Sequence, residues 1–138
     1  MSGLIVDASL VVATLIPEVD TSAAHETLEL HHAGLFAPPH LISEVTNALT
    51  VNLRKRVIDK TYRDQAVERF MGLEISLDRD SVDVQNLRRT VALADLHDLT
   101  IYDALYLELA MRKGHALGTF DRDLRNAARR EGVVISPA

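Results

Sequence analysis

The sequence predicts a single α/β domain, with a central parallel sheet of about five short strands and helices on both of its faces. Short apolar segments alternate along the chain with longer segments in which apolar residues recur at helical spacing. Such alternation predicts crossover connections and therefore a parallel sheet. The chain of 138 residues is 47% apolar, and no linker or repeat interrupts it, so we treat residues 1–138 as one unit with one core.

The first elements are two strands separated by a helix. LIVD, at 4–7, is a short apolar run that is typical of a buried strand. Residues 19–33 have the pattern of a helix that Gly34 closes. LFAPP then predicts a second strand, which Pro38 and Pro39 stop because proline has no amide hydrogen for the sheet.

Two helices and a strand are expected in the middle of the chain. A helix should run from about residue 41 to 56, and Asp59 can cap the next one. LEISL, at 73–77, is a candidate third strand. The helix expected after it carries apolar residues at helical spacing, namely Val84, Leu87, Val91 and Ala94.

The last third of the chain predicts a helix, a strand, a short helix and a final strand. Residues 99–113 form an almost entirely apolar helical segment, and HALGTFD, at 115–121, is the fourth strand candidate. DRDLRNAARR predicts a short helix. VVIS, at 133–136, completes the expected sheet.

Composition excludes several classes of protein. Because the chain has no cysteine, it has no disulfides, no thiolate zinc site and no cysteine nucleophile. The apolar runs fall far short of the ~20 residues that span a bilayer, and no basic region precedes the first one. We therefore expect a soluble cytoplasmic protein without a membrane segment. The net charge of −5 disfavours general nucleic-acid binding but leaves room for a local basic surface.

Four acidic residues are expected to converge at one edge of the sheet. Asp7 ends the first strand and Asp121 ends the fourth, so both lie at the carboxyl edge, where open α/β sheets bind ligands. The helix that carries Asp103 should begin at the same edge. Glu44 lies in the first turn of the helix after the second strand, and Asn47 lies one turn further along the same face.

A cluster of carboxylates needs a cation or a proton. Two such charges about 4 Å apart repel by roughly 4 kcal/mol at an effective dielectric constant of ~20. Oxygen ligands alone favour Mg²⁺ or Mn²⁺, and Asp7, Asp103 and Asp121 are the candidate metal ligands. Because Mg²⁺ often takes further ligands from substrate phosphate, phosphodiester hydrolysis is the natural chemistry of such a site. Glu44 or Asp121 is a candidate to orient the attacking water.

Each acid also has a purely structural interpretation. Thr100 and Asp103 form a T-x-x-D capping pattern, Asp121 can cap the helix after it, and Glu44 can be a surface acid. Asp7 is harder to explain structurally, because an acid that ends a short apolar strand has little local purpose. The four positions taken together favour the functional interpretation.

Basic residues follow Asp121. Arg122, Arg125 and Arg129 lie on one face of the predicted helix, either as a solvated face or as a binding surface for RNA phosphates. The histidines show no metal-ligand spacing and are expected to be mostly surface or packing residues. They are His25, His31, His32, His40, His97 and His115.

Four segments in this order, IVDAS, SEVTNAL, LTIYDALYLELA and GTFDRDL, resemble the PIN-domain family. Within it, they resemble the VapC-type toxins of bacterial type II toxin–antitoxin pairs. The resemblance covers essentially the whole chain. It places four residues at the acidic positions of the family, namely Asp7, Glu44, Asp103 and Asp121. It places three more at supporting polar positions, namely Ser9, Asn47 and Thr119.

The resemblance also implies an activity and partners. It implies Mg²⁺- or Mn²⁺-dependent cleavage of RNA, a homodimer, and inhibition by a small cognate antitoxin whose tail enters the active-site groove. Asp123 is a less certain match to the family, and Asp98 is expected to be a loop or capping residue.

Two other functions remain open on the sequence alone. A phosphoacceptor domain of the receiver or haloacid-dehalogenase kind also uses an aspartate at a strand end with Mg²⁺. However, LIVDAS lacks a second aspartate two residues after the first, and none of the three lysines ends a predicted strand. The third hypothesis is a catalytically silent binding module in which the acids are only helix caps.

Overall fold

The computed structural model describes residues 3–31 and 33–138. Within this part of the chain, five parallel strands form one sheet in the spatial order β3-β2-β1-β4-β5. The strands are short because each is followed at once by a helix or a tight loop. They are β1 (Leu4–Val6), β2 (Leu35–Ala37), β3 (Ser76–Leu77), β4 (Ala116–Gly118) and β5 (Ile135–Ser136).

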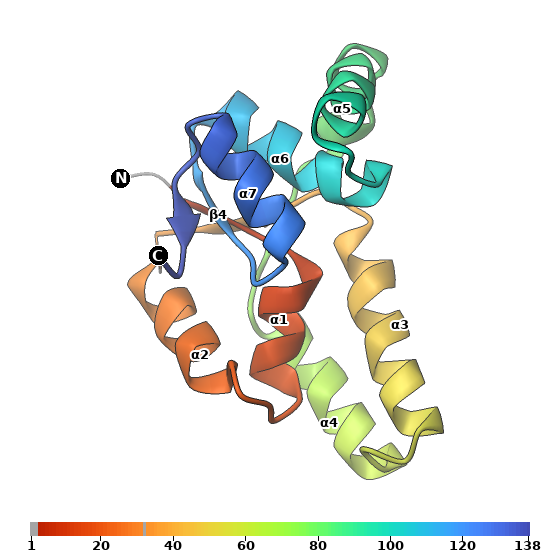
Figure 1. Cartoon of the computed structure of the whole chain (residues 1–138). Coiled ribbons are helices and arrows are strands. Elements are labelled where there is room, and N and C mark those ends of the chain that lie inside the picture. The colour runs from red at the N-terminus through yellow and green to blue at the C-terminus, as the bar shows by residue number, and fades with distance from the viewer. Residues whose placement is uncertain (1–2, 32) are drawn as a thin grey trace.

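Helices connect the strands. Two lie between β1 and β2, namely α1 (Ala8–Leu15) and α2 (Thr21–Leu30). Two more lie between β2 and β3, namely α3 (Leu41–Arg54) and α4 (Lys60–Met71). A 3₁₀ turn (η1, Arg79–Val82), α5 (Val84–His97) and α6 (Ile101–Lys113) precede β4, and α7 (Arg122–Arg130) precedes β5. Helices α1, α2 and α4 lie below the sheet in Figure 1, and α6 and α7 lie above it.

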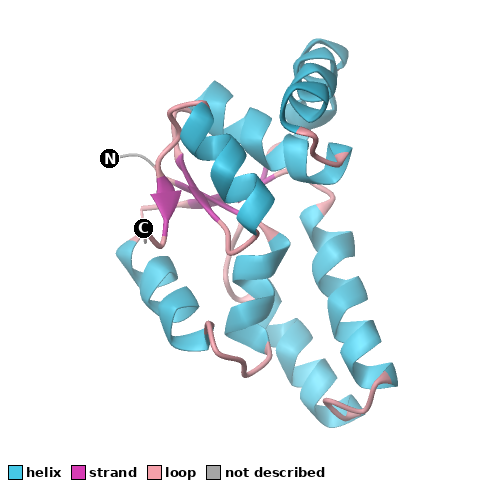
Figure 2. Ribbon diagram, in the orientation of Figure 1, coloured by secondary structure: helices cyan, strands magenta, loops and turns pink. Residues whose placement is uncertain are grey.

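The strand order reverses between β1 and β4, which are hydrogen-bonded neighbours. Val6 pairs with Gly118 in the register, and the Asp7 amide donates to the Gly118 carbonyl at 3.1 Å. Both strands therefore end at the same edge of the sheet, which confirms the expected adjacency. Figure 2 shows the loop after β4 beside the start of α1 at this edge. In parallel α/β sheets such an edge forms the ligand crevice.

The core lies on both sides of the central strands. All three residues of β1 are completely buried, and α6 is buried from Ala104 to Ala110 because it packs between the sheet, α5 and α7. Gly118 permits the close approach of α1 to β4: a Cβ atom there would lie 2.7 Å from a methyl group of Leu10. No helix in residues 3–31 and 33–138 combines the length and the apolar character that crossing a bilayer requires.

One helix of the structure is not predicted by the sequence pattern, and several strands are shorter than predicted. Helix α1 was not predicted, because ASLVVATL is rich in β-branched residues and five of its eight residues are buried, so that it shows no clear polar face. The predicted strands at 73–77, 115–121 and 133–136 shrink to two or three paired residues each.

Candidate active site

Asp7 lies at the centre of the candidate site and is 3% exposed. Its Oδ1 accepts hydrogen bonds from the Leu10 amide at 3.0 Å and from the Ser9 hydroxyl at 2.7 Å. Its Oδ2 accepts a short hydrogen bond from the Thr119 hydroxyl. Asp7 is therefore the N-cap of α1. The expectation that it has little local structural purpose was wrong, because it depended on overlooking that helix.

Burial raises the pKa of Asp7 from 3.8 to about 6. The hydrogen bonds from Thr119, Leu10 and Ser9 oppose this rise because they stabilise the ionised carboxylate. The negative charge of Asp103 adds to the rise. A carboxylate in this setting carries a charge that its surroundings do not fully neutralise.

Ser9 and Thr119 join the first turn of α1 to the loop that follows β4. The Ser9 hydroxyl oxygen accepts a hydrogen bond from the Phe120 amide at 3.0 Å. The Thr119 hydroxyl oxygen accepts one from the Asp121 amide, also at 3.0 Å. Asp121 in turn caps α7 by accepting from the Leu124 amide at 2.9 Å. The two hydroxyl groups thus hold Asp7 and the loop of Asp121 together.

Asp103 is both part of a helix cap and close to the other acids. Thr100 is the N-cap of α6, and its hydroxyl accepts the Asp103 amide hydrogen at 3.2 Å. Burial raises the pKa of the Asp103 carboxyl, and the negative charges of Asp121 and Glu44 raise it further. The half-buried carboxylate therefore interacts with all three of the other predicted acids, and the capping and cluster interpretations are compatible.

Glu44 lies in the first turn of α3, as predicted, and is bonded to two residues from outside the predicted set. Its Oε1 accepts a hydrogen bond from the Tyr106 hydroxyl at 2.6 Å and lies 3.1 Å from Nε2 of His40. Burial works against ionisation, but the contacts with His40 and Tyr106 outweigh it and lower the pKa of Glu44. The spacing of four residues between His40 and Glu44 is the one local signal that pointed to this pair.

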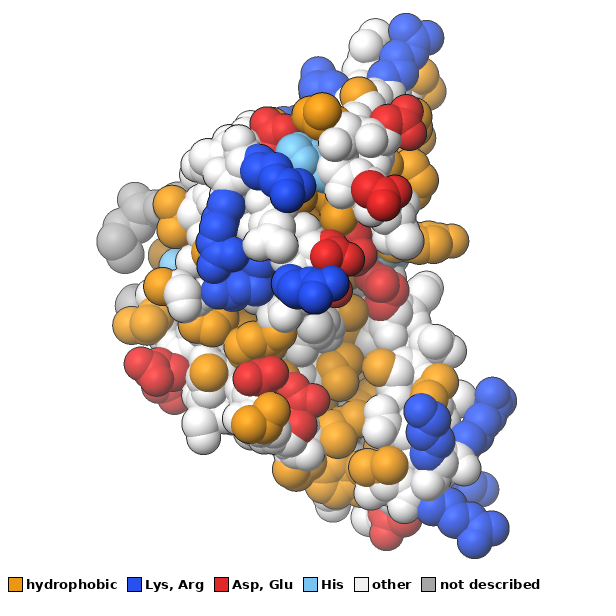
Figure 3. Space-filling model, viewed as in Figure 1, with side chains coloured by type: hydrophobic (Ala, Val, Ile, Leu, Met, Phe, Trp, Pro, Cys, Tyr) orange, Lys and Arg blue, Asp and Glu red, His pale blue; other side chains and the backbone are white. Residues whose placement is uncertain are grey.

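A groove of about 400 Å³ runs between α1 and α3 beside these acids. Ser9, Glu44 and Asn47 supply polar lining, whereas Val12 and Phe120 supply apolar walls. In Figure 3, acidic side chains gather where α3, α6 and α7 approach one another, and apolar side chains line the hollow below them. Asn47 therefore shares a surface with Glu44, one turn along α3.

The donor atoms suit a hard cation, although they do not enclose one. In the described part of the chain, no three acidic or histidine side chains are close enough together to hold an ion as they stand. The candidate ligands nevertheless offer only carboxylate oxygens, and the pKa values of Asp7 and Asp103 are raised. Oxygen donors with uncompensated negative charge are the ligands that Mg²⁺ and Mn²⁺ prefer.

The predicted basic face of α7 is divided. Arg122 and Arg129 are exposed, but Arg125 is partly buried and donates to the Thr119 carbonyl at 2.9 Å. Figure 3 shows basic side chains over α7, next to the acidic ones. Arg125 thus supports the loop that holds Asp7, whereas Arg122 and Arg129 remain available to a ligand.

Several other residues named from the sequence lie away from this cluster. Asp98 ends α5 in a left-handed conformation with φ 53°, consistent with a capping residue, and Asp123 is an exposed neighbour of Arg122. His97 pairs with Glu131 at 2.6 Å between α5 and α7. His32 lies outside the described residues.

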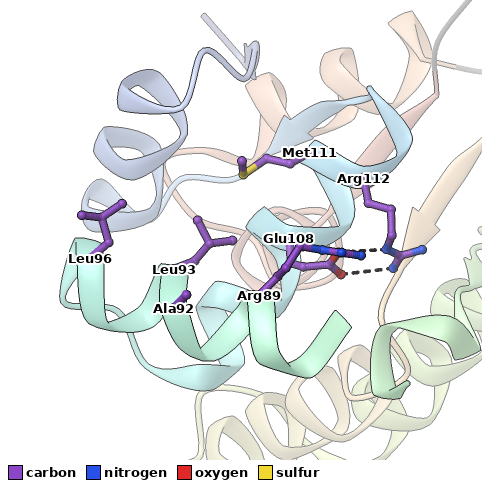
Figure 4. Close-up of a pocket in the computed structure, with 7 residues that line it drawn as sticks. All are labelled: Arg89, Ala92, Leu93, Leu96, Glu108, Met111 and Arg112. Atoms are coloured by element: carbon purple, nitrogen blue, oxygen red, sulfur yellow. Dashed lines mark hydrogen bonds and ion pairs between the residues drawn. The ribbon is translucent and has the colours of Figure 1, made fainter. Parts of the chain in front are cut away.

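Another pocket, of about 370 Å³, lies between α5 and α6, and none of the four predicted acids lines it. Figure 4 shows its apolar wall, which includes Leu93 and Leu96 from α5 and Met111 from α6. At its charged end, Glu108 is 2% exposed and accepts hydrogen bonds from Arg112 at 2.9 and 3.2 Å. Because the charges pair with each other, this end of the pocket is a structural ion pair.

The chain resembles known proteins in both sequence and fold. A model of the PIN domain family matches residues 4–130. The chain is 32% identical over 125 residues to ribonuclease VapC3 of Pyrobaculum aerophilum, covering 88% of this chain and 91% of that protein.

Solved structures share the fold at lower identity. PAE2754 from Pyrobaculum aerophilum superposes with a TM-score of 0.72 at 24% identity, covering 97% of this chain and 83% of that one. The Mycobacterium tuberculosis toxin VapC20 gives a TM-score of 0.69 at 16% identity, covering 91% and 95%. FitAcB from Neisseria gonorrhoeae gives 0.63 at 13%, covering 96% and 95%. With a family match over nearly the whole chain and a VapC relative of similar length, the chain belongs to the PIN domain family, as one of its VapC-type members.

Proposed function

We propose that the chain is a metal-dependent ribonuclease that hydrolyses RNA phosphodiester bonds at the site of Asp7, Glu44, Asp103 and Asp121. The observation that carries the proposal is Asp7: a buried carboxylate with a raised pKa, close to further acids at the switch point of a parallel sheet. The kinship with ribonuclease VapC3 supports RNA as the substrate.

Asp7, Asp103 and Asp121 are the residues that would hold Mg²⁺ or Mn²⁺. Such an ion supplies an acidic bound water and neutralises charge that develops on the phosphate. Ser9 and Thr119 keep the Asp7 carboxylate oriented through their hydrogen bonds. The exposed guanidinium groups of Arg122 and Arg129 would attract the RNA backbone.

Glu44 is the better candidate to orient the attacking water. Asp121 is already assigned to the metal, which leaves Glu44. One oxygen of each side chain is engaged, Oδ2 of Asp121 by the Leu124 amide and Oε1 of Glu44 by Tyr106 and His40, so that Glu44 keeps Oε2 for the water. The lowered pKa of Glu44 keeps it ionised at neutral pH, so that it can accept a proton from water.

The phosphoacceptor hypothesis is less well supported. The family model that matches residues 4–130 is that of the PIN domain, and the relative at 32% identity is a ribonuclease. Neither is a phosphoacceptor protein. The silent binding module also fits less well, because capping alone does not require acids close enough to raise one another's pKa.

We further propose that the protein acts as the toxin of a toxin–antitoxin pair in the cytoplasm, as a homodimer that a cognate antitoxin protein inhibits. The kinship with VapC-type proteins supports this assignment. Copurification of the chain with the product of an adjacent small gene, followed by loss of RNA cleavage in the complex, tests it.

The ribonuclease proposal is tested by incubating purified protein with labelled total RNA, with Mn²⁺ and with a chelator. The wild type should cleave only with the metal, and Asp7→Asn should be inactive. Asp95→Asn, which changes an exposed acid on α5, is the matched control and should cleave like the wild type. The absence of metal-dependent cleavage by the wild type, or cleavage by Asp7→Asn, would contradict the proposal.

A further inference from the structure

His40 directly precedes α3 and packs against two tyrosines of α6. Its ring centroid lies 4.8 Å from that of Tyr106 and 5.8 Å from that of Tyr102. The side chain is 17% exposed, so that its ring is largely confined between α3 and α6. These contacts hold His40 at the boundary between two of the helices that carry the acids.

The contacts of the ring determine where its proton lies. Nε2 is 3.1 Å from Oε1 of Glu44 and 3.0 Å from the Tyr102 carbonyl oxygen. Because a carboxylate and a carbonyl only accept hydrogen bonds, Nε2 must carry the hydrogen. Nδ1 is buried and has no hydrogen-bond partner within residues 3–31 and 33–138. A bare ring nitrogen tolerates this position better than an N–H group would, so the same tautomer is favoured twice.

His40 links the first turn of α3, which carries Glu44, to the first turn of α6, which carries Asp103. One acceptor of Nε2 is Glu44 in the first turn of α3, and the other is the carbonyl of the residue just before Asp103 in α6. The Tyr106 hydroxyl donates to the same Oε1. Oε1 of Glu44 therefore receives two hydrogen bonds, and Oε2 is left to the groove that Glu44 lines.

We propose that His40 is a positioning residue for Glu44: its Nε2–H group bridges Glu44 and the Tyr102 carbonyl, and so fixes which carboxylate oxygen is available to the reaction. His40 does not touch the substrate in this scheme. The inference rests on the proposed ribonuclease function where it concerns catalysis, but the bridge itself can be observed without it.

Three substitutions of His40 test the bridge in the full-length protein. His40→Gln places an amide N–H near the position of Nε2, His40→Asn places it nearer Nδ1, and His40→Leu removes the donor. With Mn²⁺ and labelled RNA, His40→Leu and His40→Asn should lower kcat roughly ten-fold or more while KM changes less than about two-fold. His40→Gln should keep about half of the wild-type kcat or more.

The matched control is His25→Leu, which replaces an exposed histidine on α2 and should leave kcat and KM unchanged. Thermal melts of each variant separate a loss of kcat from a loss of folded protein. A wild-type kcat in folded His40→Leu would overturn the proposal, and so would a His40→Gln variant as slow as His40→Leu.

Nitrogen NMR of ¹⁵N-histidine-labelled wild type provides a second measurement, which needs no RNA. We expect His40 to show a protonated Nε2 and an unprotonated Nδ1, and its Nε2 proton signal to shift in Glu44→Gln. A protonated Nδ1, or a signal indifferent to Glu44→Gln, would overturn the bridge. A wild type that shows the bridge but no metal-dependent cleavage would instead contradict the proposed ribonuclease function alone.

Discussion

At the scale of single residues, Asp7 meets two requirements with one carboxylate. It caps α1 through the Leu10 amide, and it contributes a negative charge to the candidate site. Burial makes that charge unfavourable in the protein without metal, whereas a bound cation would make it favourable. The free energy of unfolding should therefore change with pH and with bound metal, and the ionisation of Asp7 should account for part of both changes.

The first prediction concerns Asp7→Asn in the absence of metal. Because the pKa of Asp7 is about 6 in the folded protein, against an ordinary value of 3.8 for an exposed aspartate, the folded protein binds the proton more tightly than the unfolded chain does. As the pH rises from 4 to 7, the ionisation of Asp7 should therefore lower the stability of the wild type by up to about 3 kcal/mol. Asn caps as well as Asp does, so Asp7→Asn should avoid this loss.

Urea unfolding between pH 4 and pH 7.5 measures the difference. The variant should be the more stable protein at pH 7.5, and the gap should close toward pH 4. Asp95→Asn should follow the wild-type pH dependence. An Asp7→Asn protein that is less stable than the wild type at pH 7.5 would show that the ionised carboxylate stabilises the fold.

The second prediction concerns Asp103→Asn. Without metal, the variant should be at least as stable as the wild type, because the substitution removes repulsion from Asp121 and Glu44. The cap at Thr100 should survive, because the Asp103 amide makes it. Mn²⁺ at about one hundred times its dissociation constant should stabilise the wild type by roughly 2.7 kcal/mol, and the variant should lose most of this gain. Thermal melts with equal metal-induced shifts in both proteins would exclude Asp103 as a ligand.

At the scale of elements, α7 divides its arginines between support and recognition. Arg125 donates to the Thr119 carbonyl, whereas Arg122 and Arg129 are exposed. We predict that the double variant Arg122→Ala, Arg129→Ala binds RNA more weakly, with a salt dependence whose slope falls by roughly one unit for each phosphate that it no longer neutralises. Its Mn²⁺ affinity should remain unchanged.

Fluorescence anisotropy with labelled RNA at several salt concentrations, in the presence of a chelator to prevent cleavage, measures this slope. Arg125→Ala should differ from the double variant, because it also loosens the loop that holds Asp7. An unaltered affinity and slope in the double variant would make these arginines an ordinary solvated helix face.

The elements that sequence reasoning predicted well are those with a local signal. Thr100 marks the start of α6 because its side chain caps the helix, and Gly114 ends it in a left-handed conformation with φ 67°. Glu44 falls in the first turn of α3 because the chain turns just after Pro39. Local spacing and capping therefore predicted that Glu44, Asp103 and Asp121 lie at the starts of their helices.

The features that the sequence did not predict are those that leave no local pattern in the chain. Helix α1 is buried on so many sides that its sequence resembles a strand. Tyr106 meets Glu44 across 62 residues of chain, and His40 meets Tyr102 across the same separation. Such interactions depend on how α3 and α6 pack, which no short pattern encodes.

At the scale of the whole molecule, protection from solvent falls off from the central strands toward the outer helices. Residues of β1 are completely buried, whereas α2 buries only Ala24 and Thr27. We predict that amide hydrogens of β1, β4 and the middle of α6 exchange most slowly and that those of α2 exchange much faster. Hydrogen exchange followed by mass spectrometry measures this, and equal protection in α2 and β1 would contradict it.

The pairing of β1 with β4 has a consequence for the order in which a ribosome makes the chain. The Thr119 hydroxyl that bonds to Asp7 is synthesised 112 residues later. Until it emerges, Asp7 has neither this donor nor Asp121 beside it, and β1 lacks one of its two neighbouring strands. A growing chain therefore cannot assemble the site before this segment is made. For a protein that cuts RNA, this order of assembly would delay activity until Thr119 and Asp121 have left the ribosome.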